Sequence, residues 1–246
     1  MPSPGPKALT TIGFDADDTL WHHEQYFRMT TDRFAALLAD YAAPDHLQQR
    51  LLAAEHRNLR HYGFGVKGFV LSMIETALEV TASRVPAAVI KELLDAGREM
   101  LAHPIDLLPH VETAVSALAA DYRLVLITKG DLIDQERKLA QSGLGDRFDA
   151  IEIVSDKSEQ TYRAVFSRHG TGADQAMMVG NSLKSDVIPA LSAGSWAVHV
   201  PSALIWALDH AEPPASSPRF HSIADLGALP SLVAAVQAGV IPRSGG

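Results

Sequence analysis

The sequence contains no cysteine. Disulfide bonds, thiolate zinc sites and a cysteine nucleophile are therefore excluded. No apolar run approaches the ~20 residues that span a bilayer, and residues 1–7 lack the apolar core of a signal peptide. Basic residues are outnumbered, with 21 Lys and Arg against 29 Asp and Glu, which gives a net charge of −8. We therefore expect a cytoplasmic protein that binds neither nucleic acid nor membrane.

Apolar residues are plentiful. They make up 47% of the 246 residues, which is enough to fill a sizeable core. A chain of this length has room for one large domain, or for a domain that carries a substantial insert. The composition leaves the oligomeric state open.

Residues 24–101 show only helical periodicity. Apolar side chains recur at helical spacing in two early stretches, and two further helices are predicted over 67–80 and 86–101. The first two stretches are marked by Phe27, Phe34, Leu37 and Leu38, and by Leu47, Leu51, Leu52 and Leu59. This part of the chain is therefore predicted to be entirely α-helical.

A short apolar strand is predicted before the helical stretch, and beyond residue 109 further short apolar strands alternate with helices. The predicted strands are 8–14, 123–128, 149–154, 175–179 and 196–200, and the predicted helices are 131–142, 158–169, 184–193 and 225–238. Strands separated by single helices form right-handed βαβ units, so the fold class is α/β with a Rossmann-like parallel sheet flanked by helices. The strand at 8–14 needs partners beyond residue 120, which makes the helical stretch an insert. The predicted domains are an α/β core of 8–20 and 106–246, and an all-α domain of 21–105 that would act as a lid.

The first predicted strand ends in a cluster of acidic residues, within Ile12-Gly13-Phe14-Asp15-Ala16-Asp17-Asp18-Thr19-Leu20. Three carboxylates within four residues repel one another and require a counter-ion. The simplest is a hard divalent cation with oxygen ligands. In a parallel sheet, ligands bind beyond the carboxyl ends of the strands, so this cluster marks a candidate active site.

Polar residues also follow three later predicted strands. They are Thr128-Lys129-Gly130, Lys157, and Asn181 with Asp186. Taken singly, Thr128 fits a helix cap, Lys157 a surface lysine and Asp186 an acid in the first turn of a helix. Together they place carboxylate, hydroxyl, ammonium and carboxylate groups at one edge of one sheet.

With these residues in place, the sequence resembles the haloacid dehalogenase-like hydrolase superfamily. The resemblance rests on four motifs: Asp15-Ala16-Asp17-Asp18-Thr19, Thr128, Lys157, and Gly180-Asn181-Ser182-Leu183-Lys184-Ser185-Asp186. The helical insert resembles the cap domain that one subfamily carries between its first and second motifs. The resemblance implies a phosphatase that forms an aspartyl-phosphate, with Asp15 as nucleophile and Asp17 as general acid and base.

The resemblance also implies a cofactor and a set of binding groups. Mg²⁺ would be held by Asp15, the backbone carbonyl of Asp17, and Asp186. The phosphoryl group would be bound by Thr128 and Lys157, with help from the amides of Lys129 and Gly130. The expected substrate is a small phosphorylated metabolite. Phosphoryl transfer of the phosphomutase kind, and a non-catalytic binding or regulatory protein on the same fold, stay open as alternatives.

Three further features bear on specificity. Many relatives have aspartate where this chain has Asn181, which could orient a metal-bound water or a neighbouring group. Asp17 argues against dehalogenation, because a departing halide needs no proton.

The Gly63–Gly68 segment matches G-x-G-x-x-G but follows a charged helix rather than a strand, so it does not predict NAD binding. It is either a helix end and turn or a cap loop that reads the substrate, and in the second case the candidate contacts are Arg60, His61, Gly65 and Lys67.

Overall fold

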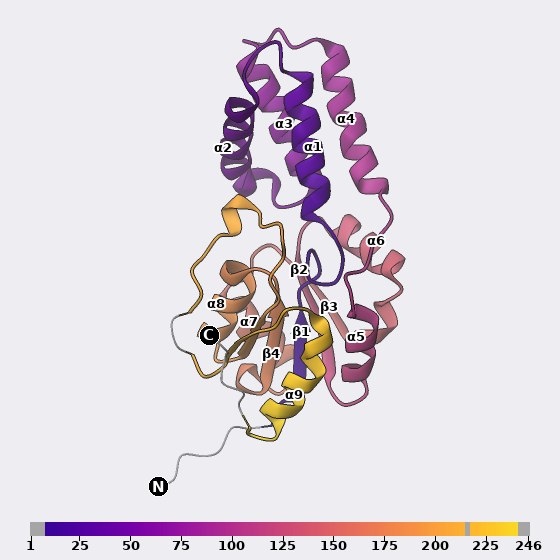
Figure 1. Cartoon of the computed structure of the whole chain (residues 1–246), viewed down its shortest axis with the longest axis vertical. Helices are drawn as coiled ribbons and strands as arrows, with labels where there is room; N and C mark the ends of the chain where they lie inside the picture. Colours follow the sequence, from indigo (N-terminus) through magenta and orange to yellow (C-terminus); the bar gives the residue numbers. More distant parts are fainter. Residues whose placement is uncertain (1–7, 215–216, 241–246) are drawn as a thin grey trace. The chain divides into compact units, whose positions relative to one another are not determined.

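The computed structural model describes residues 8–214 and 217–240. The chain divides into two compact units (Figure 1). The first unit runs to His22, and continues over Ile105–Lys129 and from Lys138 onward. The second unit comprises His23–Pro104 and Gly130–Arg137. Helix α6 (Leu132–Ser142) therefore contributes residues to both.

The first unit is built on a six-stranded sheet in which every strand pair is parallel. The strand order is β3-β2-β1-β4-β5-β6, so β1 lies between β2 and β4. The strands are β1 (Thr11–Phe14), β2 (Arg123–Lys129), β3 (Ala150–Val154), β4 (Ala176–Gly180), β5 (Trp196–His199) and β6 (Phe220–Ser222). The predicted α/β fold with a parallel sheet is confirmed.

Successive residues of the central strand face opposite sides of the sheet, as the period of two requires. Ile12 and Phe14 belong to one buried cluster, whereas Gly13 faces the other. A Cβ atom at Gly13 would lie 2.9 Å from Ile127 Cδ1 and 3.0 Å from Phe166 Cζ. Glycine at this position therefore lets α7 pack closely on the strand.

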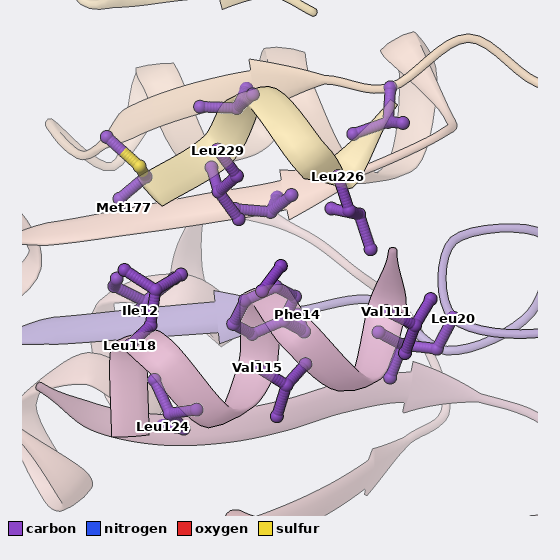
Figure 2. Close-up of a cluster of buried hydrophobic side chains, with 14 of the residues drawn as sticks. Ile12, Phe14, Leu20, Val111, Val115, Leu118, Leu124, Met177, Leu226 and Leu229 are labelled. Atoms are coloured by element: carbon purple, nitrogen blue, oxygen red, sulfur yellow. The ribbon is translucent and has the colours of Figure 1, made fainter. Parts of the chain in front are cut away.

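Helices cover both faces of the sheet. One face is covered by α5 (Val111–Ala119) and α9 (Leu229–Gln237), and the other by α7 (Glu159–His169) and α8 (Ile188–Ser192). Figure 2 shows Val115 and Leu118 of α5 and Leu229 of α9 gathered with Ile12 and Phe14 of β1. Burial of the inner strands β1, β2, β4 and β5 on both sides explains why their sequences read as continuous apolar runs.

Two elements of the first unit were not predicted. Helix α5 does carry helical spacing, because Val111, Val115 and Leu118 all face the core. Strand β6 has only three residues and no alternation to reveal it. The helix predicted over 184–193 is instead a π-helical turn, Leu183–Val187, followed by α8. The last helix begins at Leu229 rather than at 225.

The second unit contains four helices from one continuous stretch of chain. They are α1 (Glu24–Leu37), α2 (Pro44–Tyr62), α3 (Val66–Val80) and α4 (Ala87–Ala102). The second unit has a hydrophobic cluster of its own, which includes Phe34, Leu51 and Met73. No helix among residues 8–214 and 217–240 combines the length and apolarity needed to cross a membrane.

The glycine-rich segment of the second unit joins two helices. Gly63 follows α2 with φ +71°, and Gly65 precedes α3 with φ +106°. Both values lie in the left-handed region that favours glycine. A helix end and turn therefore accounts for both glycines, and no strand precedes them.

Candidate active site

The carboxyl ends of four adjacent strands carry the predicted site residues. Asp15 directly follows β1, and its backbone N–H donates to the Val179 carbonyl oxygen of β4 at 2.9 Å. Thr128 is the second-to-last residue of β2, Lys157 follows β3, and Asp186 follows β4. Their convergence is a product of the strand order, because β3, β2, β1 and β4 are neighbours.

Asp15 is buried, and its two carboxylate oxygens have different partners. Lys157 Nζ donates to Oδ1, and Thr19 Oγ1 donates to Oδ2 at 3.0 Å. Burial raises the pKa of the Asp15 carboxyl to about 7, against the opposing effect of Lys157. The ammonium of Lys157 thus compensates part of the cost of burying this carboxylate.

Lys157 links Asp15 to Asp186. Its ammonium donates to Asp186 Oδ1 at 2.7 Å, and the Ser182 N–H donates to Asp186 Oδ2 at 2.9 Å. Burial on its own would lower the pKa of Lys157, but Asp15 and Asp186 outweigh it and raise that pKa above its ordinary value. Burial, together with Asp186, also raises the pKa of the Tyr162 hydroxyl, which lies 3.4 Å from Asp186 Oδ1.

The loop after β4 is shaped to hold Asp186. A Cβ atom at Gly180 would lie 2.3 Å from Asp186 Oδ2, so only glycine leaves room for the carboxylate. Ser182 Oγ accepts a hydrogen bond from the Ser185 N–H at 3.0 Å and caps the π-helical turn. The sequence Gly180-Asn181-Ser182 therefore sets the local geometry of the site.

Asn181 faces the carboxylate cluster from the same loop. In one orientation of its side-chain amide, the NH₂ group lies 3.2 Å from Asp15 Oδ2 and 3.3 Å from the Asp17 carbonyl oxygen and donates to both. In the opposite orientation the amide oxygen faces the same groups and accepts a hydrogen bond from Thr19 Oγ1 at 3.3 Å. Its backbone N–H donates to Thr19 Oγ1 at 3.0 Å. Three groups from the segments that follow β1 and β4 therefore converge: the Asp15 carboxylate, the Asp17 carbonyl and the Asn181 amide.

These groups fit a hard cation. Within the described part of the chain, no three His, Asp or Glu side chains gather as metal ligands. A metal would instead use Asp15 Oδ2, the Asp17 carbonyl and the Asn181 amide oxygen, once the amide is turned, and these oxygens suit Mg²⁺. Asp186 was predicted as a ligand from the sequence. Its two oxygens accept hydrogen bonds from Lys157 and from the Ser182 N–H, and ligation of a metal by Asp186 stays a prediction.

The carboxylate of Asp17 has a separate set of partners. Lys138 Nζ lies 3.0 Å from Oδ1 and 3.2 Å from Oδ2, and the Trp21 indole N–H donates to Oδ1 at 2.7 Å. Sequence reasoning missed Lys138, because a lysine on an amphipathic helix is ordinarily exposed. Asp18 has φ +59° and its N–H donates to the Trp21 carbonyl, so its backbone forms the turn that follows the cluster.

The predicted phosphate-binding residues Thr128, Lys129 and Gly130 lie at or just after the end of β2. Thr128 is buried, and its hydroxyl donates to the Lys129 carbonyl at 3.2 Å. Lys129 Nζ donates to Ser185 Oγ at 2.8 Å. Gly130 falls in the second unit and has φ +136°. Phosphate binding by these residues and by Lys157 stays a prediction.

The four predicted specificity residues all lie in the second unit. Arg60 Nε donates to His61 Nε2 at 3.2 Å, and both side chains are exposed. Lys67 Nζ donates to Asp131 Oδ2 at 2.9 Å within the same unit. Gly65 provides the left-handed residue before α3. Contact with a substrate stays a prediction for all four.

The chain is similar in sequence to known hydrolases. Residues 9–194 match a family model described as haloacid dehalogenase-like hydrolase. A curated relative, the glyceraldehyde 3-phosphate phosphatase of Methanothermobacter thermautotrophicus, is 31% identical over 107 residues. That match covers 41% of this chain and 47% of the relative, so the chain matches about half the length of that relative.

Solved structures share the fold over nearly the whole chain. A haloacid dehalogenase-like hydrolase from Xanthomonas campestris is 44% identical, with a TM-score of 0.85 and coverage of 95% of this chain and 94% of the other. The magnesium-bound HAD-hydrolase YfnB of Bacillus subtilis is 17% identical, with a TM-score of 0.65 and coverage of 92% and 99%. Other structures of this fold include 2-haloacid dehalogenases as well as phosphatases, so the fold leaves the reaction undecided. The family match over most of the chain shows that this protein belongs to the haloacid dehalogenase-like hydrolases.

Proposed function

We propose that this protein is a Mg²⁺-dependent phosphomonoester hydrolase that acts on a small phosphorylated metabolite through an aspartyl-phosphate on Asp15. One observation carries the proposal: Asp15 and Asp17 are held by different partners. Asp15 lies between Lys157 and the Thr19–Asn181 pair, whereas Asp17 is held by Lys138 and Trp21. Two carboxylates with separate surroundings can take two separate roles.

In the first step, an Asp15 carboxylate oxygen attacks phosphorus and the bond from phosphorus to the ester oxygen breaks. The protonated Asp17 carboxyl gives its proton to the departing oxygen, which leaves as an alcohol. Lys157 contacts Asp15 and can also neutralise the phosphoryl oxygens beside it. The Thr128 hydroxyl at the end of β2 would donate to the same group.

In the second step, the Asp17 carboxylate takes a proton from water while the water oxygen attacks phosphorus. The bond between phosphorus and Asp15 breaks, phosphate leaves, and Asp17 is again protonated for the next cycle. Every proton is returned, so no further reactant is needed. This dual use of Asp17 separates phosphoester hydrolysis from dehalogenation, because a departing halide takes up no proton.

The residues that would hold Mg²⁺ are Asp15, the Asp17 carbonyl and Asn181. The bound ion would supply Lewis-acid polarisation of a phosphoryl oxygen and neutralise developing charge. With Asp15 and Asp186 ionised and Asp17 protonated, the ion, Lys157 and Lys138 leave the site with about two positive charges, which attract a phosphate. The magnesium bound by YfnB and the phosphatase activity named for the Methanothermobacter relative support this assignment.

The helical unit is proposed to act as a cap that selects the substrate. It joins the α/β unit directly after the acidic cluster, since its first residue is His23. The segment around Arg60, His61, Gly65 and Lys67 would contact the part of the substrate beyond the phosphate. Its basic side chains favour a substrate that carries a further polar or anionic group.

Release of inorganic phosphate tests the proposal. Purified protein with Mg²⁺ is expected to hydrolyse nitrophenyl phosphate and at least one member of a panel of small phosphorylated metabolites. Asp15→Asn should abolish release while leaving the thermal unfolding midpoint close to wild type, and EDTA should abolish it reversibly. Full activity of Asp15→Asn would exclude Asp15 as the nucleophile, and full activity in EDTA would exclude the metal.

The two alternatives give different results in the same assay. A phosphomutase-like enzyme would move the phosphoryl group to a sugar hydroxyl, so product analysis would find a phosphate-ester isomer in place of inorganic phosphate. A non-catalytic protein on this fold would release nothing from any substrate, despite correct folding and added Mg²⁺.

A further inference from the structure

Lys138 is a buried cation outside the four motifs. It lies on α6, and 7% of its side chain is exposed. Its ammonium contacts both carboxylate oxygens of Asp17, at 3.0 and 3.2 Å. Burying an ammonium is costly unless it is paired, and replacing a buried ion pair with apolar residues is often neutral or stabilising. Stability alone therefore gives little reason for a lysine at this position.

Trp21 is a second donor to the Asp17 carboxylate. Its indole N–H donates to Asp17 Oδ1 at 2.7 Å, and its ring is fully buried in the core that includes Phe14 and Leu20. The backbone of this turn is also tied down, since the Leu108 N–H donates to the Leu20 carbonyl at 2.9 Å. A donor in a packed core holds the carboxylate with little rotational freedom.

Asp17 is held although it is not itself deeply buried. Its side chain is 20% exposed, against 9% for Asp15. The carboxylate is therefore oriented by two fixed donors while part of it remains open to a reactant. An acid/base group needs this combination, because it must reach a departing oxygen and then a water molecule from a defined position.

We propose that Lys138 is a positioning residue that, with Trp21, orients the Asp17 carboxyl for proton transfer. This inference rests on the proposed phosphatase function. Lys138 touches neither the substrate nor the reacting phosphorus and keeps its own protons throughout the cycle. It acts by holding Asp17, so its loss should resemble the loss of Asp17 itself.

The leaving group separates this role from a structural one. The nitrophenolate leaving group is stable as an anion and needs little help from a general acid, whereas the alkoxide released from glycerol phosphate needs a proton. The quantity kcat/KM reports the first chemical step for both. For Lys138→Met we expect kcat/KM for glycerol phosphate to fall by about 10- to 100-fold, and by less than about 3-fold for nitrophenyl phosphate, because general acid catalysis contributes 10²–10⁴-fold.

Asp17→Asn should show the same dependence on leaving group, and the double variant should lose no more than Asp17→Asn alone. Lys138→Arg keeps a cation and is expected to retain most of the kcat/KM for glycerol phosphate. Lys91→Met removes an exposed lysine of the helical unit and serves as the matched control, with both substrates unchanged. If Lys138→Met fails to fold, Trp21→Phe removes the indole donor from the same carboxylate and should give the same selective loss.

An equal fall in kcat/KM for both substrates would overturn the inference, since it would assign Lys138 a structural role only. Additive losses in the double variant would overturn it as well. Nitrophenyl phosphate hydrolysis by wild type, abolished in Asp15→Asn, tests the proposed function separately from Lys138. Absence of that activity would overturn both proposals, whereas its presence with an unselective Lys138→Met would overturn this inference alone.

Discussion

Lys157 and Asp186 form an ion pair of 2.7 Å in the α/β unit, with 2% and 1% of their side chains exposed. The same ammonium donates to Asp15, so one cation lies between two carboxylates, one directly after β1 and one in the π-helical turn after β4. Lys157 is therefore a structural link as well as a predicted phosphate-binding group, and its removal has consequences even without a substrate.

Lys157→Met should destabilise the protein. It leaves Asp15 and Asp186 buried without their cation, and breaking a buried pair by removing one partner costs about 3–5 kcal/mol. Urea unfolding followed by circular dichroism would measure the fall in the free energy of unfolding. Lys91→Met, at an exposed surface lysine, should change it by less than about 0.5 kcal/mol. Equal effects of the two variants would contradict a buried role for Lys157.

Asn181 is expected to be a stronger determinant of Mg²⁺ affinity than Asp186. Asn181→Asp adds a negative charge beside Asp15 Oδ2 and the Asp17 carbonyl, so the Mg²⁺ Kd should fall by about tenfold. Asn181→Leu should raise the Kd by about tenfold or more. Isothermal titration with Mg²⁺ and no substrate measures both. A loss of binding in Asp186→Asn, together with unchanged binding in Asn181→Leu, would make Asp186 the ligand.

Gly180→Ala should be poorly tolerated. Its Cβ would lie 2.3 Å from Asp186 Oδ2, so either the carboxylate or the backbone must move, at a cost of about 1–3 kcal/mol. Thermal unfolding is the measurement. Gly145→Ala is a suitable control, because a Cβ there would meet no atom within 4 Å. A variant at Gly180 as stable as this control would show that the loop adapts without strain.

His221 should make stability depend on pH. Burial lowers the pKa of its imidazole in the folded state below 6.5, and its Nε2 atom is buried without a hydrogen-bond partner among the described residues. The unfolded chain therefore binds the proton more readily in the window below about pH 6.5. The free energy of unfolding should fall as the pH drops through that window.

His221→Phe keeps a ring against Trp196 but cannot titrate. The difference in unfolding free energy between wild type and His221→Phe should shift in favour of the variant as the pH falls. A difference that stays constant from pH 8 to 5 would contradict a lowered pKa for His221.

Much of the fold followed from local patterns. The alternation of apolar strands and helices predicted five of the six strands, and four of these five, β1, β2, β4 and β5, are buried on both faces and so leave continuous apolar runs. Helix α5 was overlooked although its Val111, Val115 and Leu118 have helical spacing. Strand β6 could not be found in this way, since Phe220–Ser222 is too short to show a period and pairs only with the edge strand β5.

Some residues of the candidate site could be predicted from the sequence, and others could not. Asp15, Thr128, Lys157 and Asp186 lie at or beyond the carboxyl ends of strands, so their convergence could be predicted once the sheet was expected to be parallel. The partners of Asp17 could not be predicted from the positions of the strand ends. Lys138 is 121 residues from Asp17 along the chain and lies on a helix whose pattern would place a lysine in solvent.

The sequence by itself determined the fold class, the strand ends and the residue types gathered there, because these depend on local periodicity and composition. Only the tertiary structure decided which atoms meet. It paired Lys157 with Asp186, turned the Asn181 amide toward Asp15, and brought Lys138 to Asp17. Such contacts depend on helix placement and side-chain packing, and residues distant in the chain leave no mark of them in local sequence.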